Sequence, residues 1–257
     1  MTRSGKDRVV NPAKMKLNIL GDRSSANSSR TALAVSQIGN AVKLAFEIEV
    51  VSDVICPWCW VGKRRLEKAI TLLGTDAKVT VTWRPFQLNP SMPKAGIDRN
   101  EYRRAKFGSL ERSKELDARL TAVGMTEGIE FHLDRIKRTP NTLDAHRLIW
   151  LAQKHGKQDA VVEALFKAYF VDGVDVGERK NLVDIAVSAG IEKALVEKML
   201  TTDEGLREVV AEEKRFKAMG IDGVPGFVVN GQFLFSGAAE PQVMVEAFLQ
   251  AASPTTR

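Results

Sequence analysis

The sequence predicts an α/β fold in which a small sheet with flanking helices is interrupted by a long helical block. Its two cysteines, Cys56 and Cys59, lie three positions apart at the junction of a strand and a helix. A strand–helix–strand unit surrounds this junction, and a hairpin followed by a helix comes near the end of the chain. A Cys-x-x-Cys pair in this setting is typical of the thioredoxin fold. We therefore expect a thioredoxin fold with a large all-helical insertion.

The first unit begins with residues 44–52, which are apolar and β-branched as expected of a buried strand. Residues 57–74 repeat apolar side chains at nearly helical spacing, and Pro57 stands in the first turn, where a helix tolerates proline. Residues 79–84 alternate apolar and polar side chains, which predicts a second strand. A crossover of this length predicts that the two strands pair in parallel.

A helical block is expected next, from about residue 98 to 220, because apolar residues recur there at helical spacing. We expect it to cover the fold as a lid. Residues 91–140 are highly charged, and the densest run of Lys and Arg lies at 103–112. We interpret that run as a solvated helical face.

Strand character returns at residues 226–229. The dipeptide Asn230-Gly231 follows, which is typical of a two-residue hairpin turn, and residues 232–235 pair back. After Glu240-Pro241 the spacing predicts a last helix. The predicted domains are a thioredoxin-fold domain (43–90 and 221–257) and a helical insertion domain (91–220).

The net charge of +6 is confined to the beginning of the chain. Residues 1–43 hold eight Lys or Arg and two acids, which leaves 30 basic and 30 acidic residues elsewhere. A balanced folded region is poorly suited to phosphate backbones, so we expect no nucleic-acid binding. Apolar runs stay well short of the roughly 18 residues that suggest a membrane span, so we expect no membrane partner.

Residues 1–42 are basic, rich in Ser and Asn, and lack periodicity, which predicts a disordered N-terminal extension. Their composition resembles a transit peptide, and an upstream start codon is the alternative explanation. They lack the hydrophobic stretch and cleavage site of a secretory signal. We therefore expect a cytoplasmic protein, in which a Cys-x-x-Cys pair is more often catalytic than structural.

The motif Cys56-Pro57-Trp58-Cys59 predicts dithiol–disulfide chemistry. Cys56 would cap the helix, where unpaired N–H groups and the positive end of the helix dipole stabilise a thiolate. Cys59 would lie one turn inside, close enough to form a disulfide with Cys56. A structural disulfide and a zinc site are the alternatives. However, so short a loop adds little stability, and only three histidines remain as zinc ligands, so we expect no metal.

Three segments together resemble a known family. They are CPWCWVGKRRLE, PNTLDAHRLIWLA at 140–152 and GVPGFVVNGQFLFSGA at 223–238. They are similar to DsbA-like thioredoxin proteins of the FrnE group, which are related to kappa-class glutathione transferases and 2-hydroxychromene-2-carboxylate isomerases. The resemblance covers about residues 44–252. It implies that Cys56 attacks and Cys59 resolves. It also implies a cis bond between Val224 and Pro225 that faces the disulfide, with the Val224 backbone offered to an extended substrate segment.

Other residues are assigned to supporting roles. Pro57 and Trp58 are expected to shape the substrate face. Gly226 stands where the family often has a larger residue, which predicts extra room beside the sulfur. The family pattern also singles out His146, although a lone histidine on a helix is more often a hydrogen-bonded core residue. Asp53 either orients water and relays the proton of the second cysteine, or caps the strand end.

The expected activity is that of a thiol–disulfide oxidoreductase or isomerase of the DsbA family, acting on protein or small-molecule thiols and disulfides. The alternative is a glutathione-dependent transferase or isomerase with a small aromatic or polyketide-like substrate. Those relatives usually carry serine at the first active position and need no second thiol. A chaperone that uses the exposed groove is the third hypothesis. No bound cofactor is expected, glutathione is a candidate reductant, and a homodimer is a candidate assembly.

Overall fold

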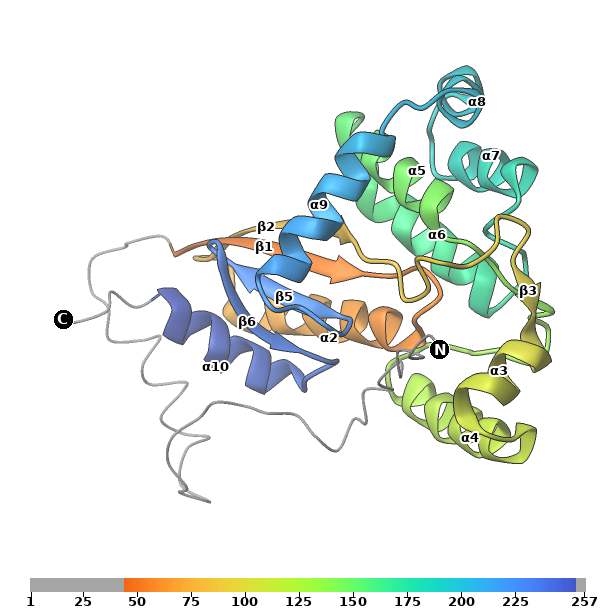
Figure 1. The fold of residues 1–257 in the computed structure, drawn as a ribbon. Helices are drawn as coiled ribbons and strands as arrows, with labels where there is room; N and C mark the ends of the chain where they lie inside the picture. Colours follow the sequence, from red (N-terminus) through yellow and green to blue (C-terminus); the bar gives the residue numbers. More distant parts are fainter. Residues whose placement is uncertain (1–43, 253–257) are drawn as a thin grey trace.

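A computed structural model describes residues 44–252, so the predicted extension at 1–42 lies outside it. Its centre is a four-stranded sheet in the order β2-β1-β5-β6 (Figure 1). β1 pairs in parallel with β2, as the crossover predicted, and antiparallel with β5, which pairs antiparallel with β6. The predicted strands are confirmed. Their bounds are Ala45–Ser52 for β1, Lys78–Pro85 for β2, Gly226–Val229 for β5 and Gln232–Ser236 for β6.

The β5–β6 hairpin has the two-residue turn that the sequence predicted. Asn230 and Gly231 both have positive φ, 50° and 79°. Asparagine and glycine adopt this conformation more readily than other residues, and it matches the twist of the strands. The Asn230 side chain also accepts a hydrogen bond from the backbone N–H of Glu47, at 2.9 Å. The turn is thereby tied to β1.

Two helices of the thioredoxin part, α2 (Pro57–Leu73) and α10 (Pro241–Ala252), lie together on one face of the sheet (Figure 1). β1 alternates its side chains between the two faces, as a strand must. Phe46 and Ile48 join the main core on the α2 side. Val51 instead joins a smaller cluster with Phe216 of α9 (Leu206–Ala218) on the opposite face.

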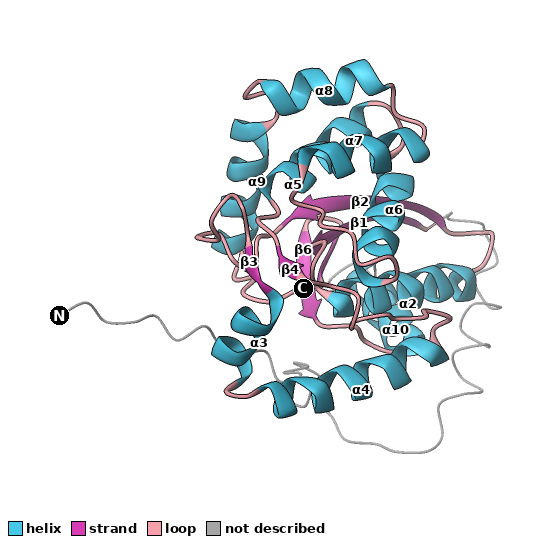
Figure 2. Cartoon of the chain, turned by 90° about the vertical axis from the view of Figure 1, so that its right-hand side faces the viewer, coloured by secondary structure: helices cyan, strands magenta, loops and turns pink. Residues whose placement is uncertain are grey.

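Four helices of the insertion lie at two ends of the molecule. Figure 2 shows α3 and α4 at one end and α7 and α8 at the other, with α5, α6 and α9 between them. The helical character predicted for residues 98–220 is confirmed over most of that range. The bounds of these helices are Arg99–Phe107 for α3, Leu110–Thr126 for α4, Leu143–Lys154 for α5, Gln158–Phe170 for α6, Arg179–Ser188 for α7, Lys193–Thr201 for α8 and Leu206–Ala218 for α9.

The insertion is not all-helical, so the prediction of helix from 98 to 220 is wrong in one stretch. Residues 127–142 form a non-helical connection in which β4 (Arg138–Thr139) pairs antiparallel with β3 (Ile97–Asp98). Within this connection every second side chain is buried, at positions 129, 131 and 133. That period of two is the pattern of extended chain. It explains why the connection packs without a helix.

The insertion shares a hydrophobic core with the thioredoxin part and does not merely cover it as a lid. Trp60 of α2 stacks on Phe166 and Phe170 of α6, with ring centroids 6.0 and 6.1 Å apart. The Trp83 indole N–H of β2 donates a hydrogen bond to Asp159 of α6, at 3.1 Å. Aromatic packing and a directed hydrogen bond therefore hold α6 against both α2 and β2.

A buried lysine reinforces this seam. Lys63 of α2 is only 3% exposed, and its ammonium lies 2.5 Å from Glu67, 3.1 Å from Asp159 and 3.4 Å from Glu163. Burial by itself lowers the pKa of Lys63, but the surrounding carboxylates outweigh burial and raise it. The lysine therefore stays charged, and two of its three partners belong to α6.

Candidate active site

Cys56 lies at the N-cap of α2, as predicted. Its backbone is extended, with φ −93° and ψ 109°, and Pro57 follows as the first helical residue. The Cys56 N–H donates to the Asp53 carbonyl at 3.0 Å, which closes the turn that leads into the helix. The Cys59 N–H donates to the Cys56 carbonyl at 2.9 Å. These two bonds set Cys56 at the start of the helix, beside the unpaired N–H groups of the first turn, and Cys59 within that turn.

The two thiols are free and inequivalent. Cys56 is 6% exposed, whereas Cys59 is fully buried. A hydrogen bond from the Cys59 thiol lowers the pKa of Cys56, against the opposing effect of burial. Burial, and then the hydrogen bond and charge of Cys56, raise the pKa of Cys59 well above the usual thiol value. Cys56 is therefore the thiol that ionises first.

The Val224–Pro225 bond is cis, which confirms the prediction. The Cys56 sulfur lies 3.7 Å from the Val224 carbonyl oxygen, so the thiol donates a hydrogen bond to that backbone. Gly62 of α2 packs closely against the Pro225 ring. A Cβ added at Gly62 would come within 2.9 Å of the proline Cγ. Sequence reasoning missed Gly62, although an isolated glycine inside a helical pattern often has a packing reason.

Gly226 does not make room beside the sulfur, so that prediction is wrong. It lies in β5, paired with Val51 of β1. A Cβ added there would meet Ile221 at 3.0 Å and Val51 at 3.5 Å. Both belong to the small cluster on one face of the sheet. The two cysteines belong to the main core on the opposite face. The absence of a side chain at Gly226 leaves space for Ile221 and does not affect the space beside the sulfur.

Asp53 and His146 are brought together behind the thiols. The fully buried Asp53 carboxylate accepts a hydrogen bond from the Leu88 N–H at 2.7 Å and one from the Ile55 N–H at 3.4 Å. It therefore ties the connection after β2 to the active-site turn. His146 Nε2 lies 3.6 Å from an Asp53 oxygen, too far for a hydrogen bond. This nitrogen is buried without a hydrogen-bond partner among residues 44–252, which differs from the hydrogen-bonded core histidine that we expected.

Pro57 and Trp58 lie next to Cys56 in the first turn of α2, and both are half-buried. Val224 is half-buried as well, whereas Pro225 is buried. The partly exposed residues thus adjoin the thiol that ionises first. Their part in substrate binding stays a prediction.

Residues 47–249 match the family model of the DSBA-like thioredoxin domain. The chain belongs to this family. A protein of Bacillus subtilis (strain 168), "Uncharacterized protein YwbO", is 27% identical over 208 residues, which cover 79% of this chain and 96% of YwbO. A probable DsbA oxidoreductase from Streptomyces coelicolor superposes with a TM-score of 0.77 at 32% identity. The match covers 82% of this chain and 92% of that one.

More distant DsbA-like structures share the fold. A 2-hydroxychromene-2-carboxylate isomerase superposes with a TM-score of 0.60 at 14% identity, covering 80% of this chain and 95% of the isomerase. The cytosolic disulfide reductase DsbM from Pseudomonas aeruginosa, solved with glutathione, has a TM-score of 0.55 at 16% identity, covering 80% and 98%. Oxidoreductases and an isomerase thus share this architecture. Within residues 44–252, no helix is both long enough and apolar enough to cross a membrane.

Proposed function

We propose that the protein is a cytoplasmic thiol–disulfide oxidoreductase that works through the Cys56–Cys59 pair. The observation that carries this proposal is the placement of two free thiols at the start of α2, with Cys56 at the N-cap and Cys59 fully buried. This placement lowers the pKa of Cys56 and raises that of Cys59. A nucleophilic thiolate and a protonated resolving thiol are the two species that disulfide exchange requires. Protein disulfides and small disulfides are the proposed substrates.

In the reductive direction, the Cys56 thiolate attacks one sulfur of a substrate disulfide. A mixed disulfide forms and the other substrate sulfur leaves as a thiolate. Cys59 then loses its proton and attacks the Cys56 sulfur, which forms the Cys56–Cys59 disulfide and releases the second substrate thiol. Two electrons pass from the protein dithiol to the substrate. A thiol such as glutathione is proposed to return them.

The first step prepares the second. The charge of Cys56 and the hydrogen bond that it accepts from Cys59 are two of the causes that raise the pKa of Cys59. When Cys56 enters the mixed disulfide its sulfur loses the charge, and a neutral disulfide sulfur is a much weaker acceptor than a thiolate. Cys59 therefore ionises more easily at the step that needs its thiolate. The departing substrate thiolate is an acceptor for the proton.

The Val224 backbone supports the proposal from the substrate side. Its carbonyl lies 3.7 Å from the Cys56 sulfur, on a half-buried residue. An extended peptide that pairs with this backbone would bring its own sulfur next to Cys56, as in a short β-augmentation. A glutathione conjugate could use the same backbone.

Trapping of the mixed disulfide tests the proposal. The Cys59→Ala protein should accumulate a covalent adduct with a disulfide-bonded substrate such as insulin, seen by intact mass spectrometry and reversed by dithiothreitol. Cys56→Ala is the matched control and should form no adduct. Reduction of insulin should fall at least 1000-fold in both variants. Full insulin reduction by Cys59→Ala would contradict the dithiol mechanism.

The glutathione-dependent alternative has a different signature. A transferase or isomerase needs one activated group and no resolving thiol. Cys59→Ala would then keep glutathione conjugation of a generic electrophile such as 1-chloro-2,4-dinitrobenzene, while exchange with insulin would be weak in every variant. The two outcomes separate the hypotheses in one set of proteins.

A further inference from the structure

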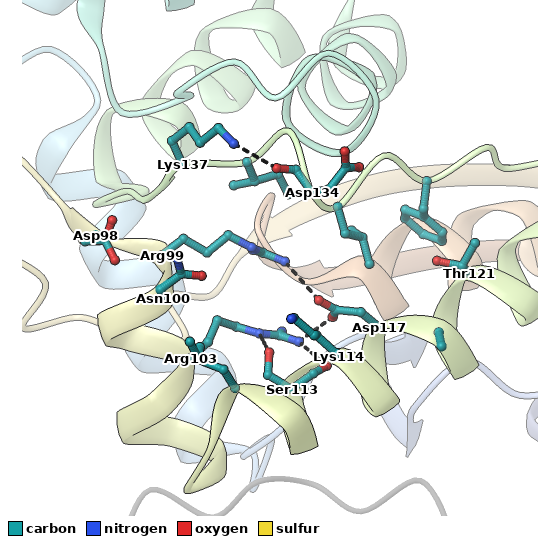
Figure 3. A pocket seen from close by; sticks show the side chains of 15 residues that line it. Asp98, Arg99, Asn100, Arg103, Ser113, Lys114, Asp117, Thr121, Asp134 and Lys137 are labelled. Carbon is teal, nitrogen blue, oxygen red and sulfur yellow. Dashed lines mark hydrogen bonds and ion pairs between the residues drawn. The ribbon is translucent and has the colours of Figure 1, made fainter.

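A cavity of about 480 Å³ lies in the insertion, between α3, α4 and the segment 131–137 (Figure 3). Its volume falls within the range of roughly 300–1,000 Å³ that small-molecule sites occupy. None of the residues assigned to the dithiol site lines it. The cavity is therefore a separate feature, and its lining decides what it could hold.

Two arginines of α3 share one carboxylate across the cavity. Arg99 and Arg103 stand one turn apart on the same face of the helix, and both reach toward Asp117 of α4 (Figure 3). Arg103 is held through its Nε and one of its two terminal nitrogens. It donates to the Ser113 hydroxyl at 2.6 Å, to the Ser113 carbonyl at 3.1 Å, and to Asp117. One carboxylate thus faces two guanidinium groups, and one positive charge remains.

The remaining charge resides on Arg99. Its side chain is 13% exposed, and Asp117 is 3.7 Å away, beyond hydrogen-bond distance. Among the residues that the structure describes, nothing accepts a hydrogen bond from the Arg99 guanidinium. Within the described part of the chain, the Arg99 nitrogens are not among the fully buried side-chain atoms that lack a partner, so they are open to the space of the cavity. Their five N–H donors are therefore available to a ligand that enters it, and their charge favours an anion.

The rest of the lining is mixed. Leu110, Phe131, Leu133 and Ile136 supply an apolar wall. At the exposed rim, Lys114 adds a second positive charge. Lys137 donates to the Asp134 carbonyl at 3.1 Å, and the Asp98 carboxylate is occupied by the Glu101 N–H at 3.0 Å. Among the described residues, neither the Asp98 nor the Asp134 carboxylate forms an ion pair with Arg99, whose one carboxylate partner is Asp117.

We propose that this cavity binds a small organic carboxylate with an apolar body. The carboxylate would accept paired hydrogen bonds from the planar Arg99 fork, a geometry that carboxylates match well. The apolar body would lie against Phe131 and its neighbours. An apolar wall and a single uncommitted guanidinium favour this class over a free phosphate, which carries more charge and no apolar surface.

Fluorescence titration of the full chain with 1-naphthoate tests the proposal. We expect saturable binding, at least tenfold weaker binding of the neutral 1-naphthalenemethanol, and little competition from orthophosphate at equal ionic strength. Arg99→Gln should weaken naphthoate binding at least tenfold. Arg112→Gln is the matched control, because it removes the same charge from an exposed position on α4 outside the cavity. Its affinity should equal that of the unmodified protein.

A gain of affinity gives the sharper test. Asp117→Asn removes the carboxylate that Arg99 and Arg103 share, so naphthoate should bind several-fold more tightly. Thermal unfolding checks that each variant folds. Equal affinity in Arg99→Gln and Arg112→Gln, or unchanged or weaker binding in a folded Asp117→Asn protein, would overturn the proposal. Strong competition by orthophosphate would show that the cavity binds phosphate and would overturn the assignment of an organic carboxylate. None of these results depends on disulfide exchange.

Discussion

The dithiol site and the α3–α4 cavity manage charge in opposite ways. The Cys56 thiolate is favoured by the Cys59 thiol and by backbone N–H groups, whereas the charge of Asp53 opposes it. In the cavity, two guanidinium groups of α3 face the single carboxylate of Asp117. The two thiols of the dithiol site lie within four consecutive residues. The cavity forms only when α3, α4 and the segment 131–137 pack together.

Phe131 connects the two regions, and this contact allows their independence to be tested. Phe131 lines the cavity and packs edge-on against Trp60, the residue after Cys59, with ring centroids 5.6 Å apart. It also packs edge-on against Phe170 of α6, again at 5.6 Å. Changes at Phe131 should affect both regions, and changes elsewhere should affect one.

Phe131→Ala should have the largest effect. Removing a buried aromatic ring leaves a void, which costs about 3–5 kcal/mol of unfolding free energy. Urea unfolding measures the loss, and both insulin reduction and naphthoate binding should fall. Phe131→Leu fills much of the void and should cost less. An unchanged unfolding free energy in Phe131→Ala would show that this aromatic cluster does not join the two parts.

Gly62→Ala should disturb the dithiol site alone. The added methyl group would come within 2.9 Å of Pro225 and 3.6 Å of Phe227. Overpacking of this kind costs about 1–3 kcal/mol. Insulin reduction should slow because Pro225 lies next to the backbone that faces Cys56, while naphthoate affinity stays the same. Thr71→Ala, at an exposed site on α2, is the control. Wild-type exchange rates in Gly62→Ala would mean that the Pro225 position is unimportant for turnover.

Asp53→Asn should change both the reactivity of Cys56 and the stability of the fold, in ways that two measurements tell apart. Because the Asp53 charge raises the pKa of Cys56, its removal should lower that pKa, and alkylation by iodoacetamide should accelerate at lower pH. The buried N–H of Leu88 would lose an ionised acceptor, at a cost of about 1–3 kcal/mol. The exposed Asp76→Asn controls for net charge. A shift of the alkylation profile to higher pH would contradict the assigned role of the carboxylate.

Helix caps should give the smallest effects. Asp98 accepts a bond from the Glu101 N–H of α3, and Ser109 accepts one from the Arg112 N–H of α4, each at 3.0 Å. Replacing either by alanine should cost about 1 kcal/mol in thermal or urea unfolding. Only Asp98→Ala removes a carboxylate from the cavity, so only this variant should bind naphthoate more tightly. Equal affinities would show that rim charges do not matter.

Sequence alone predicted the parts that short-range patterns specify. The helix-capping Cys56, the Asn230-Gly231 turn and the parallel pairing of β1 with β2 follow from spacing and local conformational preference. The cis bond before Pro225 required a family resemblance. The connection 127–142 was missed because the charge and helical spacing around it concealed the period-two burial at 129, 131 and 133.

The interpretation of 103–112 as a solvated face holds only in part. Arg104 and Arg112 are exposed, whereas Arg103 is half-buried against Ser113 and Asp117. Nothing local to the sequence distinguishes these arginines, since the difference lies in which face of α3 meets α4. Arg99 and the cavity could not be predicted from the sequence for the same reason. Similarly, the approach of His146 to Asp53 joins residues that are distant in sequence.

Lys63 ties the insertion to the redox part of the fold through ion pairs with α6. An engineer who excised residues 91–220 to obtain a minimal redox module would take away Asp159 and Glu163, two of the three carboxylates around the buried ammonium. The ammonium would keep Glu67 on its own helix, and the face of α2 that α6 covers would be exposed to water. Trp60 would lose its stacking partners Phe166 and Phe170 as well. The helical block and the redox half therefore share one core and are stabilised together.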